Sequence, residues 1–225
     1  MRPLVLFDFD GTLADTAPDL AASANRMRAR CKLPELPYDQ LRPYASKGAR
    51  GLLQASLSIT PEHSDYEYWR EEFLADYEAH MTELSGLFDG IPQLLAQLDK
   101  EGHAWGIVTN KLEYLALPMI AHLGLAERCA VTVGGDTTPH AKPHPAPLLH
   151  AADIAGFDPS HCLYVGDDER DIQAGQAAGM ATLVAAYGYG AEAQDVETWR
   201  ANAVASTTDA LWPAIQQWRQ DLIRS

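Results

Sequence analysis

The feature that most constrains this chain is a regular alternation, after Gly90, of short apolar runs with longer amphipathic stretches. The apolar runs end at glycine or polar residues, as buried strands do. Strands that alternate with helices and short loops predict a parallel sheet covered on both faces. The predicted strands are 104–109, 130–133, 162–165, 181–185 and 203–206, and the predicted helices are 91–100, 115–123, 145–155, 171–178 and 209–223.

The chain before Gly90 has a different character. The apolar run 4–9 predicts a first buried strand, which Gly11 ends. From 14 to about 84 the sequence is Ala-rich, amphipathic and broken by prolines, and it contains no convincing strand. Helices are predicted there at 19–31, 48–57 and 67–80. The fold class is therefore α/β, with a helical insert placed directly after the first strand.

Composition limits the partners of the chain. Its 17 basic against 31 acidic side chains give a formal charge of -14, which repels nucleic acid and anionic lipid. A phosphate ligand therefore needs local positive charge. No apolar run is long enough to span a membrane and no signal peptide is evident, so we expect a cytoplasmic protein. The cysteines, Cys31, Cys129 and Cys162, fit neither a disulfide framework nor a metal site.

Unusual polar residues follow four of the predicted strands. They are the runs 8–12, 109–111 and 167–171 and the loop around Lys142. Each run alone has an ordinary structural interpretation, as a surface carboxylate, a helix cap or a solvated lysine. In open α/β sheets, however, ligands bind beyond the carboxyl ends of the strands. Four such runs in order therefore predict one shared site.

The residue types indicate phosphoryl chemistry. Asp8 and Asp10 are two residues apart and point to the same face of a strand, so one can attack phosphorus while the other exchanges a proton with the leaving group. Their cluster with Asp167, Asp168 and Asp171 needs a cation among its charges. Hard carboxylate oxygens without nearby His or Cys ligands favour Mg²⁺.

Further residues are suited to hold the phosphoryl oxygens. Lys142 supplies a positive charge and Thr109 a hydroxyl, and the N–H groups of Gly11 and Asn110 could complete the cradle. Phosphoryl transfer is catalysed mainly by positioning and charge stabilisation, and this set provides both.

Four motifs resemble those of the haloacid dehalogenase superfamily of phosphohydrolases: DFDGTLADT, VTN, AKPHP and VGDDERD, in that order over nearly the whole chain. The resemblance implies a Rossmann-like core, residues 1–15 and 85–225, with a small helical cap, residues 16–84, inserted after the first strand.

The resemblance also implies roles for residues. Asp8 would be the nucleophile, Asp10 the general acid and base, and Thr109 and Lys142 phosphate ligands. Mg²⁺ would be bound by the Asp8 carboxylate, the Asp10 carbonyl and Asp167. Asp171 would orient Lys142 or a metal-bound water, and the role of Asp168 stays open.

Within the superfamily the chain is similar to a branch of phosphoglycolate phosphatases and N-acetylmuramic acid 6-phosphate phosphatases. The segments RPYASKGARGLL, VTNKLEYLALPMI and AAYGYG carry this similarity. Asp10 favours phosphate esters over halogenated substrates, although a mutase remains open. The resemblance implies a small phosphorylated metabolite as the partner, and it leaves a monomer or a homodimer open.

A cation-rich cap segment bears on the substrate. Tyr44, Ser46, Lys47 and Arg50 are the candidate specificity residues, and their cations suit a substrate with a second negative group. Phosphoglycolate is the working choice, with N-acetylmuramic acid 6-phosphate or a broad range of sugar phosphates as alternatives.

Two other classes of protein share parts of the pattern. A receiver domain also accepts phosphate on an aspartate, but it is about half this length and has no helical insert. A non-catalytic regulator of the same fold would lack Asp8 or Asp10, and both are present. Lys111, which follows the second motif, is interpreted as a solvated lysine at a helix start, and His140 and His144 are not assigned as metal ligands.

Overall fold

The computed structural model describes residues 3–192 and 194–224. The chain forms two compact units. The α/β unit takes in Met1–Ala14 and Leu87–Ser225, and the helical unit is Asp15–Gly86. The helical unit is thus inserted after the first strand of the α/β unit.

A six-stranded parallel sheet organises the α/β unit, in the order β5-β4-β1-β6-β7-β8. The first strand of the chain therefore lies inside the sheet, with Phe7 opposite Ile107 on one neighbour and Val165 on the other. The strands are β1 (Leu4–Phe7), β4 (Ala104–Val108), β5 (Thr132–Val133), β6 (Cys162–Gly166), β7 (Ala181–Ala185) and β8 (Ala203–Ala205).

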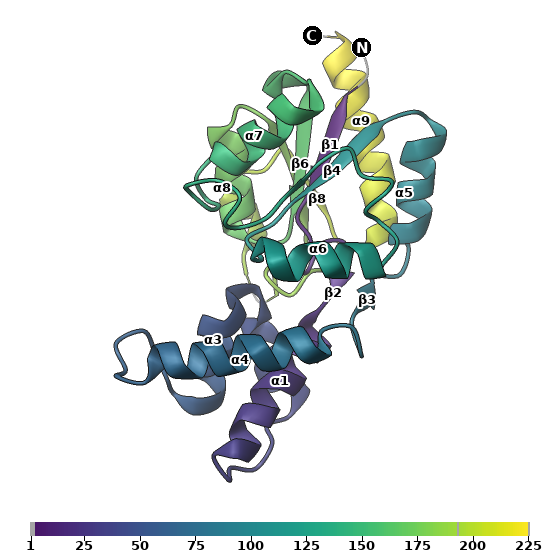
Figure 1. Cartoon of the computed structure of the whole chain (residues 1–225). Helices are drawn as coiled ribbons and strands as arrows, with labels where there is room; N and C mark the ends of the chain where they lie inside the picture. Colours follow the sequence, from purple (N-terminus) through teal and green to yellow (C-terminus); the bar gives the residue numbers. More distant parts are fainter. Residues whose placement is uncertain (1–2, 193, 225) are drawn as a thin grey trace. The chain divides into compact units, whose positions relative to one another are not determined.

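Helices cover both faces of this sheet. Figure 1 shows α7 and α8 on one side and α5 and α9 on the other. The helices of the unit are α5 (Ile91–Lys100), α6 (Glu113–His122), α7 (Ala146–Ala155), α8 (Glu169–Ala177) and α9 (Leu211–Arg224), with single 3-10 turns at Pro159–His161, Val196–Trp199 and Thr208–Ala210.

The core explains why the central strands are continuously apolar. Every residue of β1 and β6 is buried, because helices pack against both faces of a parallel sheet. Leu4, Leu6 and Tyr164 belong to one buried cluster that also holds Leu148 of α7 and Ala174 of α8. Polar residues are therefore restricted to the strand ends, and the predicted α/β fold class is confirmed.

The helical unit contains α1 (Ala17–Arg30), α2 (Tyr38–Leu41), α3 (Gly48–Leu57) and α4 (Tyr66–His80), with a 3-10 helix, η1, at Arg42–Lys47. Buried Asp76 on α4 receives the guanidinium groups of Arg26 at 2.6 Å and Arg30 at 3.2 Å, so an ion-pair cluster ties α1 to α4.

Short elements depart from the sequence-based expectations. A two-stranded sheet joins β2 (Ala14–Asp15) to β3 (Gly86–Leu87), where no strand is predicted, because two residues are too few to show a strand period. The segment 38–47 is helical although prolines punctuate it. Among the residues that the structure describes, no helix is long and apolar enough to cross a membrane.

Candidate active site

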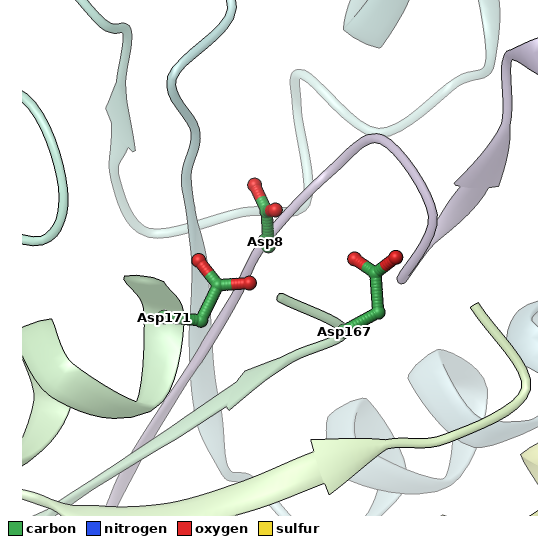
Figure 2. Close-up of side chains that lie close together, drawn as sticks. All are labelled: Asp8, Asp167 and Asp171. Carbon is green, nitrogen blue, oxygen red and sulfur yellow. The ribbon is translucent and has the colours of Figure 1, made fainter. Parts of the chain in front are cut away.

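Three buried carboxylates meet at the carboxyl edge of the sheet. Asp8 follows β1, Asp167 follows β6, and Asp171 lies in the first turn of α8. Figure 2 shows the three side chains gathered around one space. One oxygen of each lies within 4.8 Å of one oxygen of both others. The pairing of β1 with β6 produces this proximity, since adjacent parallel strands end side by side.

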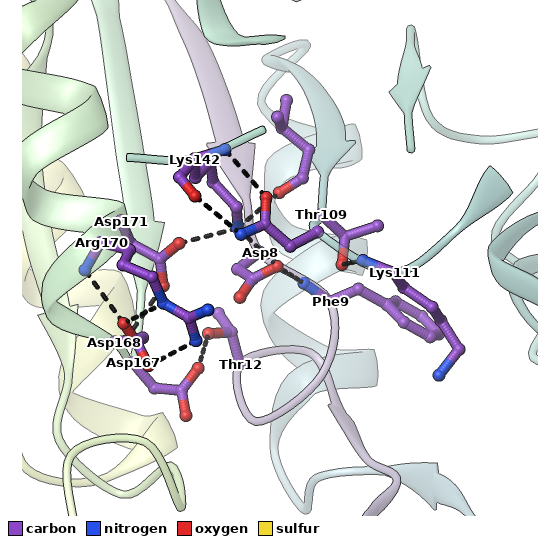
Figure 3. Close-up of polar contacts among 12 residues, drawn as sticks. Asp8, Phe9, Thr12, Thr109, Lys111, Lys142, Asp167, Asp168, Arg170 and Asp171 are labelled. Carbon is purple, nitrogen blue, oxygen red and sulfur yellow. Dashed lines mark hydrogen bonds and ion pairs between the residues drawn. The ribbon is translucent and has the colours of Figure 1, made fainter. Parts of the chain in front are cut away.

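Lys142 lies between two of these three carboxylates. Its Nζ lies 2.9 Å from Asp8 Oδ1 and 2.7 Å from Asp171 Oδ1 (Figure 3). It also donates to the Tyr164 hydroxyl at 2.7 Å. The Lys142 side chain is 2% exposed. A buried ammonium is stable only with such partners, so the two carboxylates and the tyrosine fix its position.

Asp8 is held through one of its two oxygens. The backbone N–H of Phe9 donates to Asp8 Oδ1 at 2.7 Å, and Lys142 contacts the same oxygen. The Asp8 side chain remains 12% exposed. The carboxylate is therefore oriented, and its Oδ2 is left for another contact.

The charges in the cluster do not balance. Burial raises the pKa of Asp8 to about 7, the negative charge of Asp171 adds to the shift, and Lys142 opposes it. Burial, together with the charges of Asp8 and Asp171, raises the pKa of Asp167 well above its usual range. Burial alone would lower the pKa of Lys142, but Asp171 and Asp8 raise it. Three acids thus face one ammonium.

Neutral donors position Asp167. The Thr12 hydroxyl donates to its Oδ1 at 3.1 Å and the Gly190 N–H to its Oδ2 at 2.8 Å. Gly11 turns the chain here with a φ of 86°, and a Cβ on it would lie 2.2 Å from Asp167 Oδ2. The backbone packs so closely around this carboxylate that glycine is required at position 11.

The donor set suits a hard divalent cation. Asp8, Asp167 and Asp171 supply only oxygen ligands, and the raised pKa values of Asp8 and Asp167 show a negative excess that a cation would relieve. Asp171, to which the resemblance gives an orienting role, is the third side chain of this group. For Asp10 the resemblance implies binding through the backbone carbonyl, and its side chain is not one of the three.

The second acid of the first motif pairs with a lysine. Lys111 Nζ lies 3.1 Å from Asp10 Oδ1, and the Lys111 side chain is 6% exposed. The interpretation of Lys111 as a solvated lysine is therefore wrong. The cause is that Asp10 and Lys111 are brought together by the pairing of β1 with β4, which the local sequence does not reveal.

Hydrogen bonds join the second motif to the loop that carries Lys142. Asn110 Nδ2 donates to the Lys142 carbonyl, and the Lys142 N–H donates to Asn110 Oδ1, each at 2.9 Å. Buried Thr109 accepts the Lys111 N–H at 3.1 Å through its hydroxyl oxygen. The Gly11 N–H donates to the Ala14 carbonyl at 2.9 Å, so in this conformation it is engaged within the turn rather than offered to a phosphate.

Asp168 and Asp171 share the start of α8 but differ in their partners. Their side chains form a reciprocal capping box at the first turn. Asp168 Oδ1 also lies 2.8 Å from Arg170 Nε, and the hydrogen bonds and charge of Arg170 outweigh burial and lower the pKa of Asp168. Asp171 instead reaches Lys142. Asp168 therefore stabilises the start of α8, and Asp171 holds Lys142 in the acidic cluster.

Sequence reasoning assigned no role to Tyr164, and none to Thr12 or Gly190 individually, although these two lie in the run 8–12 and the segment AAYGYG. Tyr164 accepts from Lys142 and donates to the Val108 carbonyl at 2.7 Å. A signal existed for it alone, because a tyrosine in a fully buried strand needs a partner for its hydroxyl. Thr12 and Gly190 act through a hydroxyl and a backbone N–H, which carry no distinctive pattern.

The candidate specificity residues lie on η1 and α3 of the helical unit. Tyr44 is partly exposed, and Lys47 Nζ lies 5.8 Å from the centre of its ring. Ser46 is half-buried. Arg50 is exposed on α3. A hydrogen bond with the Thr60 side chain lowers the pKa of Glu62, and the charge of Arg50 adds a smaller shift in the same direction.

Known proteins share this architecture. Residues 5–185 match the family of haloacid dehalogenase-like hydrolases. The chain is 46% identical to a phosphoglycolate phosphatase of Xanthomonas campestris pv. campestris, over 92% of this chain and 94% of that protein. It is 43% identical to an N-acetylmuramic acid 6-phosphate phosphatase of Pseudomonas aeruginosa, over 89% and 88% of the two chains.

A solved structure agrees with these matches. The crystal structure of a predicted phosphoglycolate phosphatase from Haemophilus somnus superimposes with a TM-score of 0.83 at 26% identity, over 95% of this chain and 98% of that one. The resemblance drawn from the four motifs is confirmed, and the chain belongs to the family of haloacid dehalogenase-like hydrolases.

Proposed function

We propose that this hydrolase is a Mg²⁺-dependent phosphomonoesterase that acts through a phosphoryl group on Asp8. The observation that carries the proposal is the contact of buried Lys142 with both Asp8 and Asp171. It places a fixed positive charge beside Asp8, the proposed nucleophile, whose side chain is 12% exposed. Asp10, two residues further, supplies the acid that the leaving group needs.

The reaction has two steps. Asp8 Oδ2 attacks phosphorus and forms a P–O bond, the bond from phosphorus to the ester oxygen breaks, and that oxygen takes a proton from the Asp10 carboxyl group. Water then gives a proton to Asp10 and attacks phosphorus, which releases inorganic phosphate and restores the Asp8 carboxylate. Asp10 alternates between acid and base, and Lys142 stays charged throughout.

In this proposal Asp8, Asp167 and the Asp10 carbonyl would hold Mg²⁺, which would supply positive charge to the phosphoryl oxygens. Asp171 keeps Lys142 in place, and Thr12 and Gly190 fix the orientation of Asp167. Thr109 and the Asn110 N–H complete the set of proposed phosphate ligands. The helical unit, residues 16–84, is the proposed cap over this core, residues 1–15 and 85–225.

The proposed substrate is a small phosphorylated metabolite, with 2-phosphoglycolate as the working choice. The similarity to the Xanthomonas campestris phosphatase supports it. N-acetylmuramic acid 6-phosphate is the second candidate, because the Pseudomonas aeruginosa protein is nearly as similar. Both esters carry a carboxylate, and the sugar is much larger.

The test is phosphate release with Mg²⁺ from a panel holding these two esters and glycerol phosphate. We expect turnover of at least one carboxylate ester, and Asp8→Asn should remove nearly all of it. Asp168→Asn is the matched control, because Asp168 pairs with Arg170 and asparagine still caps a helix. An Asp8→Asn variant that keeps a tenth of the activity would exclude the covalent mechanism.

A further inference from the structure

Lys111 is a buried cation that the proposed reaction does not use. It lies directly after Asn110, with 6% of its side chain exposed, and its Nζ lies 3.1 Å from Asp10 Oδ1. Its backbone N–H is held by the Thr109 hydroxyl. Both of these partners belong to the α/β unit.

The other cations near these carboxylates, among the described residues, have different partners. Lys142 lies between Asp8 and Asp171, on the nucleophile side of the site. Arg170 pairs with Asp168 through two of its nitrogens. Lys111 is a cation that the structure places against Asp10, the proposed acid for the leaving group.

That position limits where a substrate's own charge can lie. Asp10 must come within about 3 Å of the ester oxygen to give it a proton. Lys111 Nζ lies 3.1 Å from Asp10 Oδ1, so it lies within roughly 6 Å of the same ester oxygen. In phosphoglycolate a single methylene carbon separates the ester oxygen from the carboxyl group. A carboxylate there is within ion-pair reach of Lys111.

We propose that Lys111 is a specificity residue that binds the carboxylate of phosphate esters of 2-hydroxy carboxylic acids. This inference rests on the proposed phosphatase function and names the leaving group. A lysine ammonium has three N–H donors, so it can contact Asp10 and the substrate carboxylate together. The carboxylate would otherwise enter a strongly acidic site without a partner.

The geometry separates the candidate esters. The lactyl carboxylate of N-acetylmuramic acid 6-phosphate lies across the sugar ring from the phosphate, beyond this short reach. A neutral tail gains nothing from Lys111. The ammonium therefore favours esters in which the phosphate oxygen and the carboxylate are attached to the same carbon.

The experiment compares kcat/KM for 2-phosphoglycolate and for ethyl phosphate, which has a methyl group in place of the carboxylate. In Lys111→Met the ratio of the two values should fall about tenfold or more, because a charge-assisted contact is lost. Lys111→Arg should recover part of the ratio. Lys100→Met, the same change at an exposed lysine of α5, should leave the ratio as it is.

A second measurement separates substrate binding from any loss of turnover that Lys111→Met causes by displacing Asp10. Binding of the same two compounds is measured by calorimetry in Asp8→Asn, with and without Lys111→Met, and the ratio of affinities should change in the same direction. An unchanged ratio in both measurements would overturn the role of Lys111 while the phosphatase proposal stands. If the unaltered protein hydrolyses neither ester, the proposed function itself has failed.

Discussion

Asp167 shows, at the level of single residues, how the site is prepared for a cation. Its two oxygens accept from the Thr12 hydroxyl and the Gly190 N–H, both neutral donors. Lys142 contacts Asp8 and Asp171 instead. The charge of Asp167 is thus oriented but not neutralised, and this explains why its pKa is raised by burial and by its acidic neighbours.

We predict that Asp167→Asn weakens Mg²⁺ binding by tenfold or more, measured by calorimetry without substrate. Thr12→Val should have a smaller effect in the same direction, because it loosens only the orientation of the ligand. Asp168→Asn should bind Mg²⁺ as the unaltered protein does, since Asp168 pairs with Arg170. Equal losses in Asp167→Asn and Asp168→Asn would mean that the metal ligand is misassigned.

Residues differ in how far their position could be predicted. Asp8, Thr109 and Asp167 each follow a buried strand directly, and parallel strands end at one edge, so the sequence was enough to bring them together. Lys111 and Tyr164 gain their roles from Asp10 and Lys142, which are distant in the sequence and lie in the segments beyond the strand ends. Only the order of strands in the sheet reveals those partners, and local sequence does not contain it.

At the level of elements, Asp19 connects the two ends of the helical unit by hydrogen bonds. This buried carboxylate in the first turn of α1 accepts from the N–H groups of Leu84 and Ser85, at 3.1 and 2.9 Å, and from the Ser85 hydroxyl at 2.6 Å. It also lies near the positive end of the helix dipole. One side chain thus joins the beginning of the unit to its end.

Asp19→Ala is expected to lower the free energy of unfolding of the chain by about 1–3 kcal/mol, because the part-buried backbone donors of Leu84 and Ser85 lose their acceptor. Asp19→Asn keeps an acceptor oxygen of the same shape and should lose less. Urea unfolding followed by circular dichroism measures both. If the two variants unfold alike and like the unaltered protein, the contact does not stabilise the unit.

Elements with a clear period were predictable, and irregular ones were not. Helices such as α5 and α3 match their predicted ranges, 91–100 and 48–57, because apolar residues recur along one face. The segment 38–47 forms α2 and η1 although Pro37 and Pro43 suggested a break. Proline is compatible with the start of a helix, and here Pro37 is the N-cap of α2 and Pro43 lies in the first turn of η1.

At the level of the whole molecule, an α/β unit that contains the acidic site is interrupted by a helical unit that carries the candidate specificity residues. The α/β fold class was predictable because strands and helices alternate over most of the chain. The function of the helical unit is a proposal, since charge and exposure at Lys47 and Arg50 are also typical of a solvated surface.

We predict that Tyr44→Ala, Ser46→Ala, Lys47→Ala and Arg50→Ala change the ranking of substrates more than they change turnover of p-nitrophenyl phosphate. The reason is that a cap selects the substrate tail while the core performs the chemistry. The measurement is kcat/KM across the phosphate-ester panel, with thermal melting as the control for folding. A uniform loss on every substrate would assign these residues to stability rather than to selection.

The central claim is that Asp8 carries the phosphoryl group during turnover. It is tested most directly by mixing enzyme, Mg²⁺ and substrate, quenching with acid, and locating phosphate on the digested chain by mass spectrometry. We expect one phosphoryl group on the peptide that contains Asp8, and none in Asp8→Asn. Steady release of phosphate with no phosphorylated peptide, or with phosphate on a different residue, would contradict the account.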